Sequence, residues 1–325
     1  MTKTASYLAT LALGVFLNVG CGDSFTLVSH THAVAGASPA DPDSETFGFR
    51  RWVAPETKPD VVIIGIHGFC GASSDYQNLG HHMMRHQPKT AVYAYELRGQ
   101  GNDPIQHRRG DIGNPAEWYH DLFTFTELVR ERHPGAKIIW YGESMGALIA
   151  VHAWCQAKPG HPPCDGLVLS SPIVRFRDDI PAWTPGLLQI AATALPLARV
   201  SLETLTSGEE IAMTQTSTHG EQTQQNSYHV EKHTLRLLAT LARHIDGMNA
   251  CATQLTGPIL ILHGGQDFFN NDSDIRGFIA RMPAQADVTY RHYPRSYHLL
   301  MYDEKRARVF RDVARWCTRL RRSGQ

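Results

Sequence analysis

The chain has 325 residues, of which 42% are hydrophobic and 19% charged, and this composition excludes an intrinsically disordered chain and a membrane protein with many spans. The 31 Lys and Arg residues balance the 31 Asp and Glu residues, so no net charge attracts nucleic acid or acidic lipid. We therefore expect no nucleic-acid partner and a small, weakly charged molecule as the ligand.

The N-terminus has the layout of an export signal. Lys3 precedes an apolar stretch over 5–19, which is typical of a secretory signal peptide and too short to favour a permanent membrane span. Cys21 follows Leu-Asn-Val-Gly, which is similar to a bacterial lipoprotein cleavage box, so we predict a signal peptide over 1–20 and a lipid anchor to a membrane at Cys21. The alternative is cleavage after Ala-Val-Ala at 33–35, which would give a periplasmic or secreted protein.

Five further cysteines lie beyond this signal region, and an oxidising compartment would favour disulfide bonds among them. Cys155 and Cys164 flank a turn rich in Pro and Gly and form the best candidate pair. Cys251 and Cys317 are a second candidate pair, which would leave Cys70 free. The alternative is that all five are small buried hydrophobic residues.

Strands and helices alternate over residues 46–172, after a Ser/Pro/Asp-containing linker over 21–45. The run at 61–66 lacks polar alternation, which is typical of a strand covered on both faces of a parallel sheet. The expected strands lie at 47–53, 61–66, 91–95, 137–141 and 166–170, and the expected helices at 75–86, at 115–132 and from Met145. The pattern predicts an α/β fold with a mostly parallel, doubly wound sheet.

The alternation stops over residues 173–256, which we expect to form a helical cap inserted into the sheet domain. The core resumes over 257–325, with strands at 258–262 and 287–293 and a final amphipathic helix at 305–320.

An apolar stripe marks the expected cap. Trp183, Leu187 and Leu188 begin a run that Pro185 and Pro196 interrupt, which favours a cap helix over a membrane span. We expect these three apolar side chains to line a substrate pocket. The alternative is a helix packed on the sheet domain.

A GxSxG motif places a serine between a strand and a helix. Gly142 to Gly146 follows the strand at 137–141 directly and precedes a helical segment. Such a tight turn leaves no room for side chains at its two glycines and exposes the central serine, so Ser144 is the candidate nucleophile.

A serine hydroxyl needs a base that is itself oriented by an acid. Asp267 follows the strand at 258–262, at the strand end where ligand sites of open α/β sheets form, and His298 follows the strand at 287–293. The order Ser144, Asp267, His298 is that of the α/β-hydrolase fold. Taken singly, Asp267 could cap a helix and His298 could be an ordinary loop histidine.

Acyl transfer also requires hydrogen-bond donors for the developing oxyanion. We expect the backbone N–H groups of Met145, after the serine, and Phe69, in the Gly-containing turn after the strand at 61–66. His67 would brace this turn. The chemistry needs no cofactor, and we expect no metal site, since no pair among the 18 histidines shows a convincing metal-ligand spacing.

The chain resembles the monoacylglycerol lipase and lysophospholipase branch of the α/β-hydrolases, also described as serine-aminopeptidase-like hydrolases. The shared blocks are HGF at 67–69, SDY at 74–76, YELRGQG at 95–101, GESMG at 142–146, GLVLSSP at 166–172, LHGGQD at 262–267 and YHLL at 297–300. The resemblance implies the same three catalytic residues and oxyanion donors, and a helical cap over an acyl-chain pocket. The chain departs from the family pattern at Glu96, usually aspartate, at Gln100, usually histidine, and at Ala147, often glycine.

We therefore expect a serine hydrolase that cleaves a monoacylglycerol, a lysophospholipid or a similar single-chain lipid ester through an acyl-serine intermediate. A proline-iminopeptidase-like aminopeptidase is the first alternative, with Glu209, Glu210 or Glu221 binding the free amine. A non-catalytic binding module is the second. The sequence gives no indication of the oligomeric state.

Overall fold

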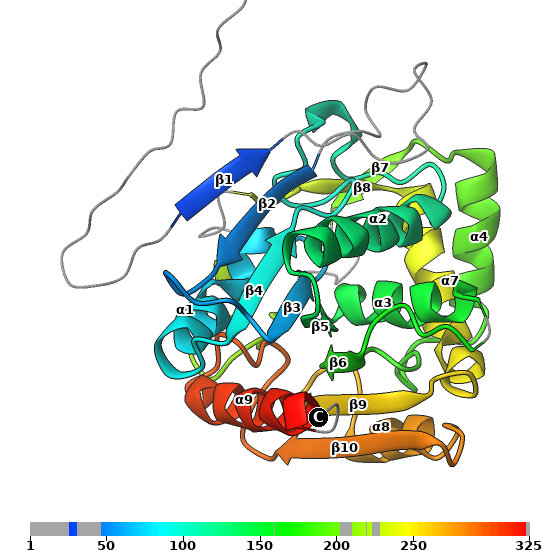
Figure 1. Ribbon diagram of the computed structural model, residues 1–325. Helices are drawn as coiled ribbons and strands as arrows, with labels where there is room; N and C mark the ends of the chain where they lie inside the picture. The colour runs from blue at the N-terminus through cyan, green and yellow to red at the C-terminus, as the bar shows by residue number, and fades with distance from the viewer. Residues whose placement is uncertain are drawn as a thin grey trace, which may run out of the picture.

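A twisted eight-stranded sheet forms the centre of the protein (Figure 1). The computed structural model describes residues 26–30, 47–158, 160–201, 210–218, 220–222 and 228–322. The strands follow the order β1 (Thr26–His30), β2 (Phe47–Trp52), β4 (Thr90–Tyr95), β3 (Val61–Ile66), β5 (Lys137–Glu143), β6 (Gly166–Ser170), β9 (Gly257–Gly264) and β10 (Ala286–Tyr293). All neighbouring pairs from β4 to β10 are parallel, whereas β2 runs antiparallel to β4 and to β1.

Helices cover both faces of the sheet and create two separate hydrophobic cores (Figure 1). Along β3, Val62 and Ile64 point into one core and Val61 and Ile63 into the other, as the two-residue period of a strand requires. The first core contains α2 (Ala116–Arg132), α3 (Met145–Gln156), α7 (Leu235–Ala252) and α8 (Asp272–Ile279), and the second contains α1 (Gln77–His86) and α9 (Arg306–Arg322). Burial on both faces explains the uninterrupted apolar runs of the central strands.

The predicted doubly wound α/β fold is confirmed, with element ends within a few residues of those expected. Four strands and helices were not predicted. Strand β1 lies within the expected linker over 21–45, where Thr-Leu-Val-Ser-His pairs with β2. Helix α8 is a short element between β9 and β10, and β7 (Arg199–Ser201) pairs with β8 (Lys232–Thr234) in a small second sheet.

The insertion between β6 and β9 contains α4 (Thr184–Ala194), β7, β8 and α7. Helix α4 packs on α7, and α7 packs in turn on α3 (Figure 1). Leu237 and Met248 of α7 are fully buried in the first core. The second half of the expected cap is therefore a structural part of the sheet domain.

The expected disulfide pairs do not form, because all five cysteines from Cys70 to Cys317 are thiols. Cys251 lies in the first core and Cys317 in the second, on opposite faces of the sheet, so they cannot bond to each other. Among the described residues, no helix has both the length and the apolar character that a membrane span needs. The expected signal peptide and Cys21 lie outside the described residues.

Candidate active site

Ser144 lies at a sharp turn between β5 and α3. Its φ of 52° and ψ of −113° fall in a region that non-glycine residues rarely adopt, and it is 8% exposed. The Ser144 N–H donates to the Ser170 carbonyl at the end of β6 (3.0 Å). A strained backbone of this kind persists only where the surrounding structure fixes it.

The two glycines of the motif are required by contacts with the backbone. A Cβ atom at Gly142 would lie 2.5 Å from the Gly146 carbonyl oxygen. A Cβ at Gly146 would lie 1.8 Å from the Ile66 carbonyl oxygen, which is impossible without moving β3 or α3. The turn can therefore form only with glycine at both positions.

Asp267 and His298 form a buried pair in the loops that follow β9 and β10. The His298 Nδ1–H donates to Asp267 Oδ2 (2.9 Å), and the two side chains are 1% and 2% exposed. Asp267 Oδ1 accepts the Phe269 N–H (2.8 Å), so both carboxylate oxygens are fixed. Because Nδ1 carries the proton in this bond, Nε2 of a neutral His298 keeps its lone pair.

Sheet order brings the serine to this pair. The carboxyl ends of parallel strands lie at one edge of a sheet, and β5, β6, β9 and β10 are successive neighbours. Ser171, directly after β6, donates its hydroxyl to the His298 carbonyl oxygen (2.6 Å). Ser144, Asp267 and His298 therefore all lie at the same edge of the sheet.

The turn after β3 lies against Ser144. A Cβ at Gly68 would be 3.4 Å from the Ser144 Cβ, so the backbone of the turn is in close contact with the serine. Met145 is the first residue of α3, where N–H groups have no partner within the helix. No backbone hydrogen bond in the described part of the chain uses the N–H of Phe69 or Met145. Both N–H groups are available to bind an anion.

His67 is fixed in one tautomer by its two neighbours. Its Nε2 accepts the Leu97 N–H (3.0 Å), so Nε2 carries no proton. Nδ1–H therefore donates to the Gly68 carbonyl oxygen (3.0 Å). That carbonyl shares a planar peptide with the Phe69 N–H, so fixing one fixes the direction of the other. His67 braces the turn, as expected.

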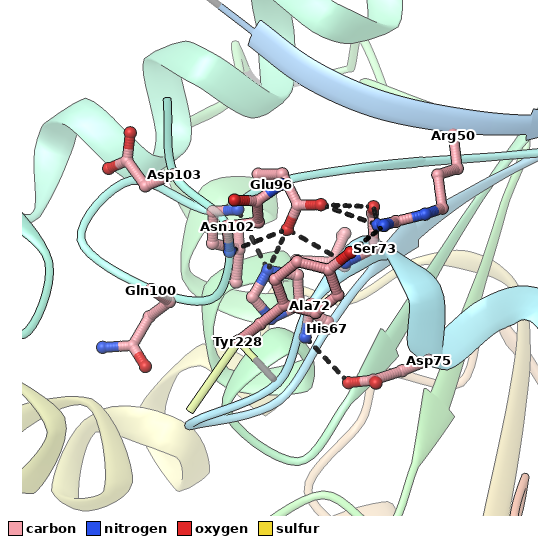
Figure 2. A network of polar contacts seen from close by, with 12 residues as sticks. Arg50, His67, Ala72, Ser73, Asp75, Glu96, Gln100, Asn102, Asp103 and Tyr228 are labelled. Atoms are coloured by element: carbon pink, nitrogen blue, oxygen red, sulfur yellow. Dashed lines mark hydrogen bonds and ion pairs between the residues drawn. The ribbon is translucent and has the colours of Figure 1, made fainter. Parts of the chain in front are cut away.

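A buried network around Glu96 connects this turn to the sheet (Figure 2). Glu96 Oε1 accepts hydrogen bonds from Arg50 Nη1 (2.9 Å) and the Ser73 hydroxyl (2.5 Å). Its Oε2 accepts the N–H groups of Ser73 (3.1 Å) and Asn102 (3.3 Å). Arg50 also donates to the Tyr228 hydroxyl (2.9 Å), which lies in the insertion. Glu96 thus joins β2, two loops and, through Arg50, the insertion.

Gln100 holds the residue after Phe69. Its side-chain oxygen accepts the Cys70 N–H (3.0 Å), and Gln100 is fully buried. Cys70 itself has a φ of 57°, so the peptide after Phe69 has an unusual backbone conformation. Two of the three departures from the family pattern, Glu96 and Gln100, therefore both hold the segment that follows β3.

Two carboxyl groups, the buried Glu143 and the partly buried Asp75, lie close to the turn. Burial, followed by the nearby Asp75 carboxyl, raises the pKa of Glu143 well above its ordinary value. Glu143 Oε1 has no hydrogen-bond partner in the described part of the chain. Burial also raises the pKa of Asp75, which accepts hydrogen bonds from the Ala72 N–H (3.0 Å) and the Tyr302 hydroxyl (3.1 Å). Burial therefore favours the neutral form of Glu143, the residue directly before Ser144.

The three residues of the expected apolar pocket wall do not share one orientation, and their place in a substrate pocket stays a prediction. Trp183 and Leu187 are 65% and 55% exposed and lie on the outer side of α4, whereas Leu188 packs against the first core. None of the three lines the groove of about 730 Å³ between α4, α7 and the loop after β6. A helical period shows that two faces differ but not which face turns outward.

One group of side chains among the described residues could hold a metal ion. His263 of β9, His292 of β10 and Asp272 of α8 place their ligand atoms within 4.8 Å of one another. Sequence spacing did not indicate this group, because it forms through the pairing of His292 with His263 in neighbouring strands. Tyr290 already donates to Asp272 Oδ1 (2.7 Å).

Comparison with known proteins identifies relatives over most of the chain. The profile of the family described as serine aminopeptidase, S33, matches residues 57–305. A monoacylglycerol lipase from Mycolicibacterium smegmatis is 25% identical over 81% of this chain and 89% of its own length.

Two solved structures share the fold. The monoacylglycerol lipase of Paleococcus ferrophilus has a TM-score of 0.70 at 18% identity, covering 84% of this chain and 99% of its own. A soluble variant of the Saccharomyces cerevisiae monoglyceride lipase, bound to a substrate analogue, has a TM-score of 0.71 at 19% identity, covering 84% and 92%.

Proposed function

The chain belongs to the serine aminopeptidase S33 family, and from this premise we propose that it is an ester hydrolase for single-chain lipid esters such as monoacylglycerols or lysophospholipids. The names of the Mycolicibacterium relative and of the two structural neighbours favour a monoacylglycerol substrate. Apolar side chains exposed on and around α4 favour a lipid over a charged substrate.

One observation carries the proposal. The serine at the strained turn lies at the same sheet edge as a buried His298–Asp267 pair and next to two free N–H groups. These are the nucleophile, the base with its orienting acid, and the oxyanion donors that acyl transfer requires.

In the proposed reaction, Ser144 Oγ attacks the ester carbonyl carbon while His298 Nε2 takes its proton. Asp267 holds the Nδ1–H and stabilises the imidazolium that forms. The N–H groups of Phe69 and Met145 bind the oxyanion, and each such donor contributes about 3–4 kcal/mol to transition-state stabilisation. His298 then protonates the leaving alcohol, and a water molecule, activated by the same base, releases the fatty acid.

The first experiment compares the wild type with Ser144→Ala on p-nitrophenyl esters of increasing acyl length and on a monoacylglycerol. Ser273→Ala, on the exposed side of α8, is the matched control. We expect Ser144→Ala to lose at least about 10⁴-fold in kcat and to resist a fluorophosphonate probe, while the control keeps both. Rates that rise with acyl length support a lipid ester. Equal rates for Ser144→Ala and wild type would refute the proposal.

The aminopeptidase alternative is tested in the same assay. Release of proline from a fluorogenic substrate, with every ester uncleaved, would favour it. Of the glutamates considered for amine binding, Glu210 and Glu221 are exposed and Glu209 lies outside the described residues. Neither of the two described glutamates is buried, and Glu221 already accepts the Thr218 N–H (2.9 Å).

We further propose that the protein is exported and anchored to a membrane through a lipid on Cys21, on the basis of the N-terminal sequence alone. Mass spectrometry of the mature N-terminus tests this proposal. A lipidated Cys21 as first residue would support it. An unmodified terminus beyond residue 21 would refute the anchor and leave a soluble exported protein.

A further inference from the structure

Two cysteines on facing helices lie in contact, far along the chain from each other. Cys155 is near the end of α3 and Cys251 near the end of α7, and the two helices pack together (Figure 1). Their thiols are hydrogen-bond partners, and the Cys155 thiol also approaches the Cys251 carbonyl oxygen (3.6 Å). Cys155 is partly exposed, and Cys251 is buried, with 8% of its surface exposed. A small oxidant can therefore approach from the Cys155 side.

A histidine is positioned as a base for Cys251. His152 lies one helical turn before Cys155 on the same face of α3, and its Nδ1 is 3.6 Å from the Cys251 sulfur. Its Nε2 lies 2.8 Å from the His244 carbonyl oxygen. Because a carbonyl oxygen only accepts, Nε2 carries the proton, and Nδ1 of the neutral ring can take the proton of Cys251.

The facing helix leaves room for this ring. A Cβ at Gly247 of α7 would lie 2.7 Å from Cε1 of His152. Glycine inside a helix costs about 1 kcal/mol relative to alanine, and here it admits the imidazole between the helices. His244, one turn before Gly247, is itself fixed by the Tyr119 hydroxyl (2.6 Å). The position of His152 is therefore set by packing from α2, α3 and α7.

A lowered pKa distinguishes Cys251 from the other thiols. The hydrogen bond from Cys155, followed by the contact with His152, lowers the pKa of Cys251. By contrast, burial raises the pKa of Cys70, Cys164 and Cys317 to about 12. Since the thiolate is the reactive form, Cys251 is the reactive cysteine among the five.

We propose that Cys155 and Cys251 are a redox-active dithiol that hydrogen peroxide closes to a disulfide, which joins α3 to α7. The Cys251 thiolate attacks one peroxide oxygen, so that an S–O bond forms, the O–O bond breaks and the departing hydroxide takes the proton from His152 as water. The Cys155 sulfur then displaces the hydroxyl group from Cys251, and its own proton leaves with that group as a second water. Two thiols lose two electrons, and one peroxide becomes two waters.

The test is peroxide oxidation of the full, folded chain, followed by alkylation of free thiols and peptide mapping without reduction. We expect one cross-linked peptide pair, Cys155 to Cys251, lighter by two hydrogens, with Cys70, Cys164 and Cys317 alkylated. The oxidised protein should have a higher Tm, reversed by a reductant, because the link constrains the unfolded chain. Alkylation of both Cys155 and Cys251 after oxidation would overturn the proposal, as would a link from either to another cysteine.

Variants separate the steps. Cys155→Ser should stop at a sulfenic acid on Cys251 that dimedone traps, and His152→Asn should slow loss of the Cys251 thiol at least about 10-fold. Cys164→Ser is the matched control and should cross-link as the wild type does. An unchanged rate in a folded His152→Asn variant would refute the role of the histidine. The cross-link in wild-type protein tests the pair itself, even if a variant fails to fold.

Discussion

Replacing Asp267 by asparagine tests the proposed catalytic pair, because it changes which ring nitrogen of His298 carries the proton. In the wild type, Oδ1 accepts the Phe269 N–H and Oδ2 accepts the His298 Nδ1–H. If the asparagine oxygen keeps the Phe269 contact, its NH₂ group faces Nδ1 and forces the imidazole proton onto Nε2. His298 then cannot accept the serine proton.

The flipped amide restores the correct tautomer but turns NH₂ toward the Phe269 N–H. A buried donor without an acceptor costs about 1–3 kcal/mol, so only about 20% to under 1% of molecules would be competent. We therefore expect kcat to fall by about 5- to 150-fold if the amide can flip, and by up to about 10⁴-fold if the flip is blocked. The assay is steady-state hydrolysis of a p-nitrophenyl ester, with Asp272→Asn on α8 as the control. A loss of under threefold in folded Asp267→Asn would refute the assignment.

Three further predictions concern the turn and its supports. Gly146→Ala should lower the free energy of unfolding by at least about 3 kcal/mol in urea titrations, because its Cβ would overlap the Ile66 carbonyl. Gly113→Ala is the control, and its free energy of unfolding should change little, because no atom lies within 4 Å of the added Cβ. Gln100→Ala should reduce kcat by about 5- to 150-fold with little change in KM, because it leaves the buried Cys70 N–H unpaired beside Phe69, the proposed oxyanion donor. An unchanged kcat would contradict this support role. Glu143→Gln should match the wild type in stability near and below pH 4.5 and exceed it increasingly at higher pH. The reason is that the raised pKa of Glu143 makes folding favour the protonated carboxyl, and this contribution is lost as pH rises through the folded pKa. Parallel stability curves of the two proteins, from chemical denaturation at several pH values, would show the reasoning to be wrong.

Sequence patterns predicted those features that depend on local periodicity and on strand ends. The apolar run of β3 and the GxSxG motif after β5 each contain the physical reason for their structure within a few residues. Asp267 and His298 could be predicted because the fold gathers strand ends at one edge. Helix α8 had a readable signal that was missed, since Asn271 and Asp274 form a capping box.

Contacts between distant segments could not be predicted in this way. Arg50 of β2 contacts Glu96, which directly follows the neighbouring strand β4. Cys155 meets Cys251 only because α3 and α7 pack in one particular register. The outward side of α4 depends on which helix it packs against, which a single amphipathic period does not specify. In each case the missing information is the tertiary packing of segments that are distant in the sequence.

The neighbouring positions of β6 and β9 have a consequence for how this protein could change over evolution. The chain leaves the sheet at the C-terminal end of β6 and enters the parallel neighbour β9 at its opposite end, so α7 runs back across the sheet between them. The part of the insertion before α7 therefore begins and ends at the carboxyl edge of the strands, and such a segment can be exchanged without disturbing the strands that hold it. Because α7 is buried against α3, the exchangeable module ends before Thr234, the residue that caps α7. New specificities could therefore arise by replacing α4 and its connections while the hydrolytic centre stays intact.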